Sequence, residues 1–301
     1  IHLEPGTIPT RVSKCRNIPY AYMEKLQEEM NKLEEEGIIS KVTKPTEWVH
    51  PIVVAPKKNS EAIRLCIDFR NLNKHSLREV YSSPTVLETV QTINGDKAKL
   101  FSKFDAKKGY HQCELDEDSK DLTTFLTPFG RFRYERAPFR VNSIPEHYNR
   151  RMQEALENLP GVARVVDDIL VYGATKEEHD ENVNKLLQRC QERNIRLNEE
   201  KFVYCREEIE FAGVIINKDG FKANPDLMKA IAEFPEPCTA KEVRSFHGTV
   251  NQLSPYDSKL TEKLEPIRHL LKVKKGPIKL TEEESRAFEE VKKHLTSAET
   301  L

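Results

Sequence analysis

The chain has 301 residues and an almost balanced charge, with 48 basic and 49 acidic side chains and a formal net charge of −1. Since binding to a polyanion by bulk charge needs a basic excess, any nucleic acid would have to be held by a local basic face. No window approaches the roughly 20 consecutive apolar residues of a membrane span, and the N-terminus does not resemble a signal peptide. The six cysteines lack C-x-x-C spacing, which predicts reduced thiols in an intracellular, non-secreted protein.

The N-terminal part is predicted to contain a long amphipathic helix followed by strands. The helix is expected over 20–36, ends at Gly37, and places on one face Met23, Leu26, Met30 and Leu33. Strands are expected at 38–42, 52–56 and 63–68.

Three aspartates in the middle of the chain carry the strongest chemical signal. Alternating apolar residues over 100–110 predict a strand that ends at Asp105. Asp167 and Asp168 stand between two apolar runs, a pattern that predicts a hairpin whose tip presents both charges. An exposed turn is the commoner role of such a pair. Since carboxylates are hard oxygen ligands, an aspartate on one strand facing an Asp-Asp tip could instead hold two divalent ions.

The second half of the chain predicts mainly helices. A capping box at 175–178 opens a helix that ends near Asn194 and uses Val183, Leu186, Leu187 and Cys190. Further helices are expected after Asn224, Thr239 and Thr281.

A local basic face could be formed by cations that alternate with aromatic residues around 129–134. The candidates are Lys103, Lys107, Lys108, Arg131, Arg133, Arg136, Arg140, Arg150 and Arg151. For 131–136, a solvent-facing strand edge is an equally weighted alternative.

Seven segments together resemble one family. They are IRLCIDFRNLNK (63–74), FSKFDAKKGYHQ (101–112), LTTFLTPF (122–129), APF (137–139), DDILVY (167–172), LNEEK (197–201) and FAG (211–213). Their order and spacing resemble the reverse transcriptases of gypsy-type LTR retrotransposons, which belong to retroviral-like Pol polyproteins. The resemblance extends over about residues 10–300 and implies an α+β right-hand polymerase fold, with a ferredoxin-like antiparallel palm and a helical thumb.

The resemblance also implies a division into subdomains. It places the N-terminal part of the fingers at 1–80, the first part of the palm at 81–120, a return through fingers and palm at 121–145, the second part of the palm at 146–220, the thumb at 221–275, and the start of a linker toward an RNase H-like domain at 276–301.

Catalytic residues carry over one at a time. Asp105 and Asp167 match the metal-binding carboxylates, Asp168 matches the third, supporting carboxylate, and all three are candidate metal ligands. Lys201 matches the lysine that protonates the leaving pyrophosphate, although a lysine near a helix end more often compensates the helix dipole.

Binding residues carry over in the same way. Lys58 and Arg64 match the residues that hold the incoming triphosphate, where cations neutralise phosphoryl oxygens. Tyr110 matches the aromatic beside the sugar 2′ position, and Phe139 lines the nucleotide pocket with Arg140 next to it. A solvated turn for Lys58 and a core position for Tyr110 are the simpler alternatives.

The resemblance also implies primer and template contacts for Val165, Val166, Phe211 and Gly213. Without the resemblance, the residues 211–215 predict only an ordinary strand.

The chain departs from the family pattern at several positions. Val165 replaces an aromatic residue, and Arg140 replaces a glycine at a position where glycine normally allows close backbone approach to a ligand. His247 and Asp257 replace apolar residues in the thumb. These departures raise the alternative of an RT-derived module with impaired catalysis.

The resulting expectation is an RNA-directed DNA polymerase that transfers nucleotides with two Mg²⁺, or with Mn²⁺ as a substitute. Its partners would be an RNA or DNA template with primer, dNTPs, and RNase H and integrase domains of the same polyprotein, in a cytoplasmic particle or the nucleus. The alternative is a catalytically impaired nucleic-acid-binding or assembly module. A metal-dependent nuclease explains the acids but leaves Arg64, Tyr110 and Phe139 unexplained.

Overall fold

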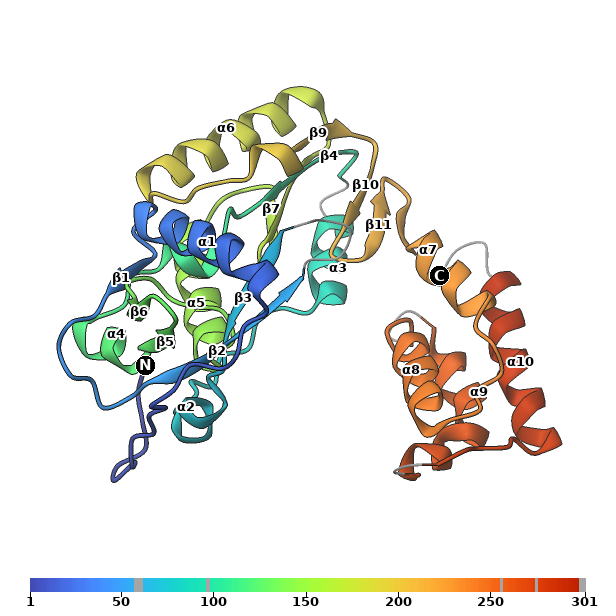
Figure 1. Cartoon of the computed structure of the whole chain (residues 1–301). Helices are drawn as coiled ribbons and strands as arrows, with labels where there is room; N and C mark the ends of the chain where they lie inside the picture. Colours follow the sequence, from blue (N-terminus) through green and yellow to red (C-terminus); the bar gives the residue numbers. More distant parts are fainter. Residues whose placement is uncertain (57–61, 96–97, 255–256, 274–275, 298–301) are drawn as a thin grey trace. The chain divides into compact units, whose positions relative to one another are not determined.

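The computed structural model describes residues 1–56, 62–95, 98–254, 257–273 and 276–297, and the chain divides into two compact units (Figure 1). Unit 1 comprises Ile1–Ser83, Ala106–Asn158 and Arg189–Leu197, and unit 2 comprises Pro84–Asp105, Leu159–Gln188 and Asn198–Leu301. Within the described residues, no helix combines the length and the apolar composition needed to cross a membrane.

Unit 1 is built on a five-stranded sheet with strand order β1-β6-β5-β2-β3. Neighbouring strands are antiparallel except β2 and β5, which are parallel. The strands are β1 (Ile39–Lys41), β2 (His50–Pro56), β3 (Ile63–Ile67), β5 (Phe125–Thr127) and β6 (Gly130–Tyr134). The three predicted N-terminal strands are therefore confirmed, with small changes at their ends.

The helices of unit 1 pack around this sheet. They are η1 (Tyr20–Tyr22), α1 (Met23–Glu35), α2 (Arg70–His75), η2 (Gly109–Gln112), α4 (Glu117–Leu122) and α5 (Ile144–Leu156). In α1 the predicted apolar face is confirmed, because Leu26, Met30 and Leu33 are buried in the core of the unit. The helix ends as predicted, with Gly37 at φ +65°, a conformation in which glycine avoids a side-chain clash.

Unit 2 contains a four-stranded antiparallel sheet with order β7-β8-β4-β9 and a three-stranded antiparallel sheet β10-β11-β12. The strands are β4 (Leu100–Asp105), β7 (Val162–Val165), β8 (Asp168–Gly173), β9 (Val203–Arg206), β10 (Glu208–Phe211), β11 (Val214–Asn217) and β12 (Gly220–Ala223). Both sheets, with α3 (Val86–Gly95), enclose an apolar core that includes Phe101, Leu170 and Phe211. The predicted hairpin around the paired aspartates is confirmed as β7 and β8.

Helix α6 (Lys176–Glu192) begins in unit 2 and packs on the sheet, where Asn182 Nδ2 donates to the Tyr172 carbonyl of β8 at 3.0 Å. Its buried face is centred on His179, Asn182 and Leu186. The prediction that Leu187 belongs to this face is wrong, since its side chain is 43% exposed. At about 100° per residue, Leu187 lies a quarter turn away from the centre of the buried stripe.

The C-terminal part of unit 2 is helical. It contains α7 (Pro225–Ala232), α8 (Ala240–Asn251), α9 (Ser258–Arg268), η4 (His269–Lys272) and α10 (Glu282–Ser297). The predicted starts are confirmed: Asn224 caps α7, Thr239 forms a capping box on α8, and Thr281 exchanges hydrogen bonds with Glu284 at the start of α10.

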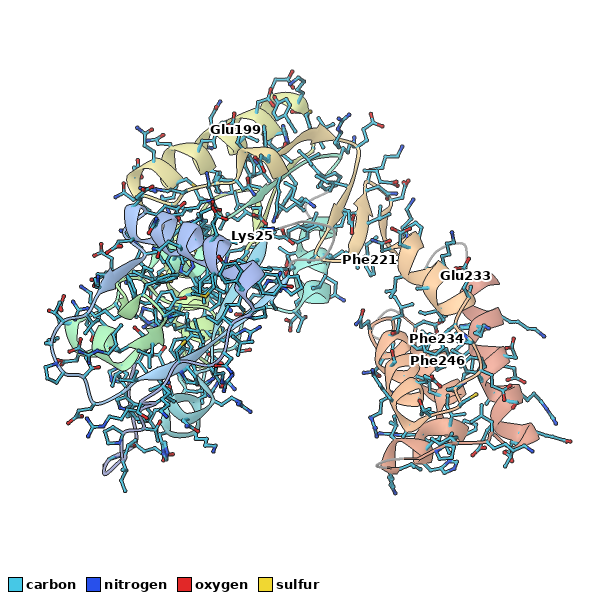
Figure 2. The ribbon with its side chains drawn as sticks, viewed as in Figure 1. Lys25, Glu199, Phe221, Glu233, Phe234 and Phe246 are labelled. Atoms are coloured by element: carbon cyan, nitrogen blue, oxygen red, sulfur yellow. The ribbon has the colours of Figure 1, made fainter. Side chains whose placement is uncertain are left out.

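Aromatic side chains fill the core between these helices. Figure 2 shows Phe234 next to Phe246, and their ring centroids lie 5.4 Å apart. The Phe246 ring also contacts Phe288 of α10 at 4.5 Å. Asp257, a departure from the family pattern, has a local role, because its carboxylate accepts from the Lys259 N–H and caps α9.

Candidate active site

The sheet of unit 2 brings two of the three predicted carboxylates together. Asp105 is the last residue of β4 and lies directly opposite Asp168, the first residue of β8, in the antiparallel ladder. Side chains at directly opposed positions start about 4.5–5.5 Å apart at their Cβ atoms. Asp167 precedes Asp168 in the turn that joins β7 and β8.

The turn that carries Asp167 has an unusual backbone. Val165 pairs with Asp168, so Val166 and Asp167 form a two-residue connection, and Val166 has φ +53°. A positive φ at the first turn residue is typical of a type II′ hairpin, where glycine is the usual residue. For a β-branched side chain this conformation costs on the order of 1–3 kcal/mol. The Val166 carbonyl accepts from Arg164 Nη1 at 2.8 Å, which helps to hold the turn in this form.

Lys201 lies at the carboxylates. Its Nζ donates to Asp105 Oδ2 at 2.9 Å, and the backbone N–H of Asn198 donates to the Asp105 carbonyl at 2.8 Å. The short helix η3 (Glu199–Lys201), capped by Asn198, therefore fixes the lysine beside the end of β4. The hydrogen bond that Lys201 donates to Asp105 raises the pKa of Lys201, so the ammonium form is favoured.

The environment of Asp168 differs from that of an exposed aspartate. Burial raises the pKa of its carboxyl group, and the negative charges of Asp105 and Asp167 act in the same direction. Lys103 and Lys201 oppose this shift. The centre thus concentrates three carboxylates that repel one another, a situation that a bound cation relieves.

The donor set fits a divalent cation in its chemistry, because carboxylate oxygens are the ligands that Mg²⁺ prefers. Within the described part of the chain, however, no group of three or more His, Cys, Asp or Glu side chains is arranged to hold a metal ion. The strand ladder places Asp105 opposite Asp168, and the convergence of all three carboxylates on a metal ion stays a prediction. The ammonium group of Lys201 is paired with Oδ2 of Asp105.

The predicted nucleotide-binding residues of unit 1 form an aromatic group. The ring of Tyr110, on η2, lies 5.0 Å from that of Phe139 and 5.1 Å from that of Tyr148. Phe139 also contacts His111 edge to face at 5.0 Å. Phe139 is 48% exposed, so the group offers one aromatic surface to solvent while Tyr110 is half-buried behind it. Tyr110 has both a packing role and a position next to exposed surface.

Arg64 and Lys58 were predicted to bind the triphosphate. Arg64 is an exposed residue of β3, opposite Ala55 of β2. Lys58 lies outside the described residues.

Arg140 has φ +73°, which explains why glycine suits this position in the family. The loop is tied to Asn73 of α2: its Nδ2 donates to the Arg140 carbonyl at 2.8 Å, and its Oδ1 accepts from the Asn142 N–H at 3.0 Å. Asn142 Nδ2 returns a bond to the Asn73 carbonyl at 3.1 Å. Sequence reasoning missed Asn73, and no local signal in the sequence marks this long-range clamp.

The residues predicted to contact primer and template differ in accessibility. Val165 is half-buried and packs against the core of unit 2, and Val166 is 40% exposed. Phe211 is fully buried and faces the core, because β10 alternates between exposed and buried residues; its place in a primer-binding segment stays a prediction. Gly213 is exposed in the turn between β10 and β11, with φ +86°.

Arg133 does not belong to an open basic face. Its guanidinium pairs with Glu117, Asp121 and Glu135 at 3.2, 2.8 and 3.1 Å. The alternation of aromatic and basic residues along β6 thus does not leave the Arg133 side chain open to solvent. Helix α4, which lies earlier in the sequence, supplies two of the acids that pair with it.

The family model described as reverse transcriptase (RNA-dependent DNA polymerase) matches residues 55–216 of the chain. The chain belongs to this family. The resemblance inferred from the seven segments is therefore confirmed.

Curated relatives include polyproteins of transposons and viruses. The chain is 29% identical over 290 residues to the retrovirus-related Pol polyprotein from transposon gypsy of Drosophila melanogaster, covering 91% of this chain and 28% of that protein. It is 30% identical over 295 residues to the enzymatic polyprotein of cauliflower mosaic virus (strain D/H), covering 95% of this chain and 43% of that protein. The chain thus spans less than half the length of these relatives.

Solved structures of reverse transcriptases have the same fold. The foamy viral protease-reverse transcriptase dRH in complex with double-stranded DNA superimposes with a TM-score of 0.85 at 23% identity, covering 99% of this chain and 52% of that one. The foamy viral protease-reverse transcriptase in complex with RNA/DNA hybrid gives 0.83 at 24% identity, covering 99% and 40%. The predicted α+β polymerase fold is confirmed.

Proposed function

We propose that this chain is the RNA-directed DNA polymerase domain of a retrotransposon Pol polyprotein. The observation that carries the proposal is the pairing of Asp105 with Asp168 across β4 and β8, with Lys201 hydrogen-bonded to Asp105. Family membership supplies the reaction class, and this geometry supplies the groups that it needs.

Each residue of the carboxylate centre has a role in the proposal. Asp105 and Asp167 would hold two Mg²⁺, or Mn²⁺ as a substitute, and Asp168 would support them. When bound, these ions stabilise the attacking and leaving oxygens of a phosphoryl transfer. Lys201 is kept protonated by Asp105, so it can donate a proton to the leaving pyrophosphate. Before ions bind, its ammonium group neutralises Asp105.

The dNTP would be bound by residues of unit 1. In the proposal Arg64, with Lys58, neutralises the triphosphate, and Tyr110 and Phe139 contact the sugar and base. The half-buried position of Tyr110 between Phe139 and Tyr148 suits a rigid steric boundary, because its ring has little freedom to move aside. Arg140 is exposed beside Phe139 and would partly fill the nucleotide pocket.

The remaining partners follow from the relatives. A template with primer is proposed because the foamy viral enzymes were solved with double-stranded DNA and an RNA/DNA hybrid. Val165, Val166 and Gly213 are proposed to contact it, with the fingers, palm and thumb divided as the sequence predicts. RNase H and integrase domains of the same polyprotein, in a cytoplasmic particle or the nucleus, complete the proposal.

Primer extension on poly(rA)/oligo(dT) with Mg²⁺ tests the proposal. We expect incorporation of dTTP by the unmodified chain and its loss in Asp105→Asn. Asp219→Asn, which changes an exposed carboxylate in the turn between β11 and β12, is the matched control and should retain activity. Template binding without extension by the unmodified chain would instead favour the impaired module, for which Arg140 and Val165 argue.

A further inference from the structure

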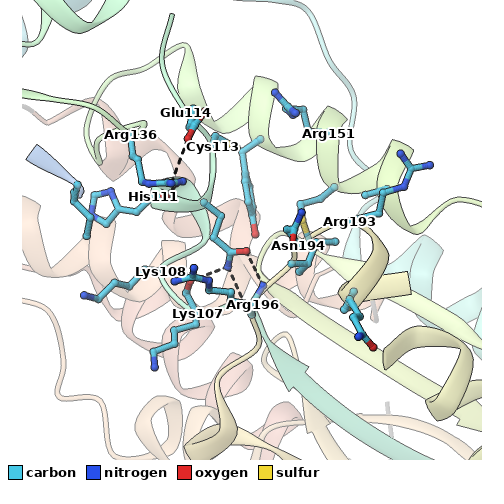
Figure 3. Close-up of a pocket in the computed structure, with 18 of the residues that line it drawn as sticks. Lys107, Lys108, His111, Cys113, Glu114, Arg136, Arg151, Arg193, Asn194 and Arg196 are labelled. Atoms are coloured by element: carbon cyan, nitrogen blue, oxygen red, sulfur yellow. Dashed lines mark hydrogen bonds and ion pairs between the residues drawn. The ribbon is translucent and has the colours of Figure 1, made fainter. Parts of the chain in front are cut away.

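Unit 1 contains a cavity of about 1150 Å³ that none of the proposed catalytic or nucleotide-binding residues lines. Its walls come from the segment after β4, the C-terminal half of α5, and the residues that follow α6 (Figure 3). The charged residues that line it are six basic and three acidic side chains: Lys107, Lys108, Arg136, Arg151, Arg193 and Arg196, with Glu36, Glu114 and Glu154.

Each of the three acids has a basic partner. Glu36 pairs with Lys108 at 2.5 Å, and Glu114 pairs with Arg136 at 3.3 Å. Glu154 pairs with Arg150, which lies outside the cavity lining, at 3.3 Å.

Four of the six cations are left over. Among the described residues, the charged side chains of Lys107, Arg151, Arg193 and Arg196 make no ion pair and no hydrogen bond, and all four residues are exposed. In a chain with a net charge of −1, this is a strong local excess of positive charge.

Arg151 does not serve the end of its own helix, α5. The negative end of α5 is covered by Arg189, whose Nη1 donates to the carbonyls of Ala155 and Glu157 at 3.0 and 3.1 Å. Arg151 is therefore not needed there. The positive field also reaches buried groups of the wall: Arg151 and Arg136 oppose the rise in the pKa of Cys113 that burial causes.

Two cationic segments of the cavity wall are joined by a backbone hydrogen bond from the Lys107 N–H to the Arg196 carbonyl at 2.9 Å and by the side chain of Gln112. Gln112 Nε2 donates to the carbonyls of Lys107 and Arg196 at 2.8 and 2.9 Å, and its Oε1 accepts from the Arg196 N–H at 2.8 Å. Figure 3 shows Lys107, Lys108 and Arg196 gathered around these bonds, with Arg151 and Arg193 apart from them. Two cationic segments far apart in sequence are thus held in one arrangement before any ligand binds, which reduces the entropy lost on binding.

We propose that this cavity binds a compact ligand with two or more linked phosphate groups. Guanidinium groups suit phosphate because they donate several hydrogen bonds in a fixed planar geometry, and three of the four uncommitted cations are arginines. The volume exceeds what one phosphate needs and suits a small oligophosphate or a short phosphodiester segment. The site shares no residue with the dNTP contacts proposed above, and it does not require polymerase activity.

Calorimetric titration with inorganic tripolyphosphate tests the proposal, without template, primer or dNTP. We expect saturable binding that weakens at least tenfold in the double variant Arg151→Gln/Arg196→Gln. The control Arg206→Gln/Arg286→Gln removes the same charge from exposed arginines of unit 2, and binding should change less than twofold. Equal weakening in both double variants, or no saturable binding to the unmodified chain, would overturn the proposal.

A second arm identifies the source of the phosphates. If a short oligothymidylate displaces tripolyphosphate, the site binds a nucleic-acid strand. If tripolyphosphate binds saturably and the oligothymidylate does not displace it, the site binds a free oligophosphate. Gln112→Ala provides an independent variant, since it leaves every charge in place but removes three of the hydrogen bonds that hold the two segments together. Weaker binding in this variant, with an unchanged thermal unfolding midpoint, is the expected result; unchanged affinity would refute the preorganised site.

Discussion

Replacing Ser102 with alanine tests the polar network behind the carboxylate centre. Ser102 lies on β4, is fully buried, and its hydroxyl accepts from the Cys205 N–H at 2.8 Å. Cys205 has φ +47° at a register shift in the pairing of β9 with β4. The same hydroxyl lies 2.8 Å from Nε2 of His179, which is also fully buried. One hydroxyl group therefore provides a hydrogen-bond partner both for the backbone N–H of Cys205 and for the His179 ring.

The hydrogen positions follow from this geometry. Because the Asp180 carboxylate can only accept, a neutral His179 ring carries its proton on Nδ1, and its Nε2 accepts from the Ser102 hydroxyl. The imidazole proton is placed on Nδ1, which donates to Asp180 Oδ1 at 2.9 Å. Tyr204 and Lys176 also donate to Asp180, both at 2.7 Å.

The expected loss of stability can be worked from these contacts. Ser102→Ala leaves one backbone N–H and one buried imidazole nitrogen without a partner, and each such group costs about 1–3 kcal/mol. We expect a total of about 2–4 kcal/mol, which for a unit of this size lowers the unfolding midpoint by roughly 10 °C. Urea denaturation followed by far-UV circular dichroism measures the free energy. Ser285→Ala, a half-buried position on α10, is the control and should change it by less than about 0.5 kcal/mol.

A loss below about 1 kcal/mol would refute the reasoning, because it would mean that the network supplies other partners. The imidazole gives a second readout that does not depend on stability. Nitrogen NMR shifts of His179 should show the Nδ1–H form in the unmodified chain. An Nε2–H form would contradict the assigned direction of the hydrogen bonds.

Four further predictions follow from single positions. Arg140→Gly should stabilise unit 1 by about 0.5–1 kcal/mol, since relief of the left-handed backbone outweighs the entropy of glycine, and should raise dNTP incorporation; a fall in incorporation would make the arginine a phosphate ligand. Gly173→Ala places a Cβ 2.6 Å from a backbone nitrogen of α6, and urea denaturation should show a free energy of unfolding lower by at least about 2 kcal/mol. Gly248→Ala has open space around the new Cβ, and it should raise the free energy of unfolding by about 1 kcal/mol. Tyr110→Val should admit ribonucleotides while dNTP use persists, and equal loss of both in primer extension would indicate a packing role alone. Asp168→Asn should raise the unfolding midpoint at pH 7. The pKa of the Asp168 carboxyl group is raised in the folded state, so this group stabilises the fold most below its pKa in the unfolded chain, and that contribution is lost as the pH rises through the folded pKa. The gain in midpoint should therefore vanish in strong acid.

Local patterns predicted the elements and the carboxylates well. Asp105 was placed at a strand end by the alternation of its neighbours, and the structure ends β4 at that residue. Gly37 and Thr239 marked helix boundaries because the signals for stops and caps lie within a few residues of each other. These features depend on short-range physics that a single sequence displays.

The errors came from contacts between distant segments. Arg133 was a candidate for a basic face, but two of its three acid partners come from α4. Leu187 lies outside a buried face whose centre includes a buried histidine and a buried asparagine. The bond of Ser102 with His179 spans 77 positions in the sequence. Without the fold, nothing local distinguishes such residues from ordinary polar or apolar ones.

The fluorescence of the single tryptophan of the chain reports on unit 1 alone. Trp48 is 2% exposed in the core of unit 1 and stacks near His50 at 5.8 Å. Its emission therefore follows the unfolding of that unit, while unit 2 contributes no tryptophan signal. A denaturation curve recorded by fluorescence, laid over one recorded by circular dichroism, separates the cooperative transition of one unit from that of the whole chain.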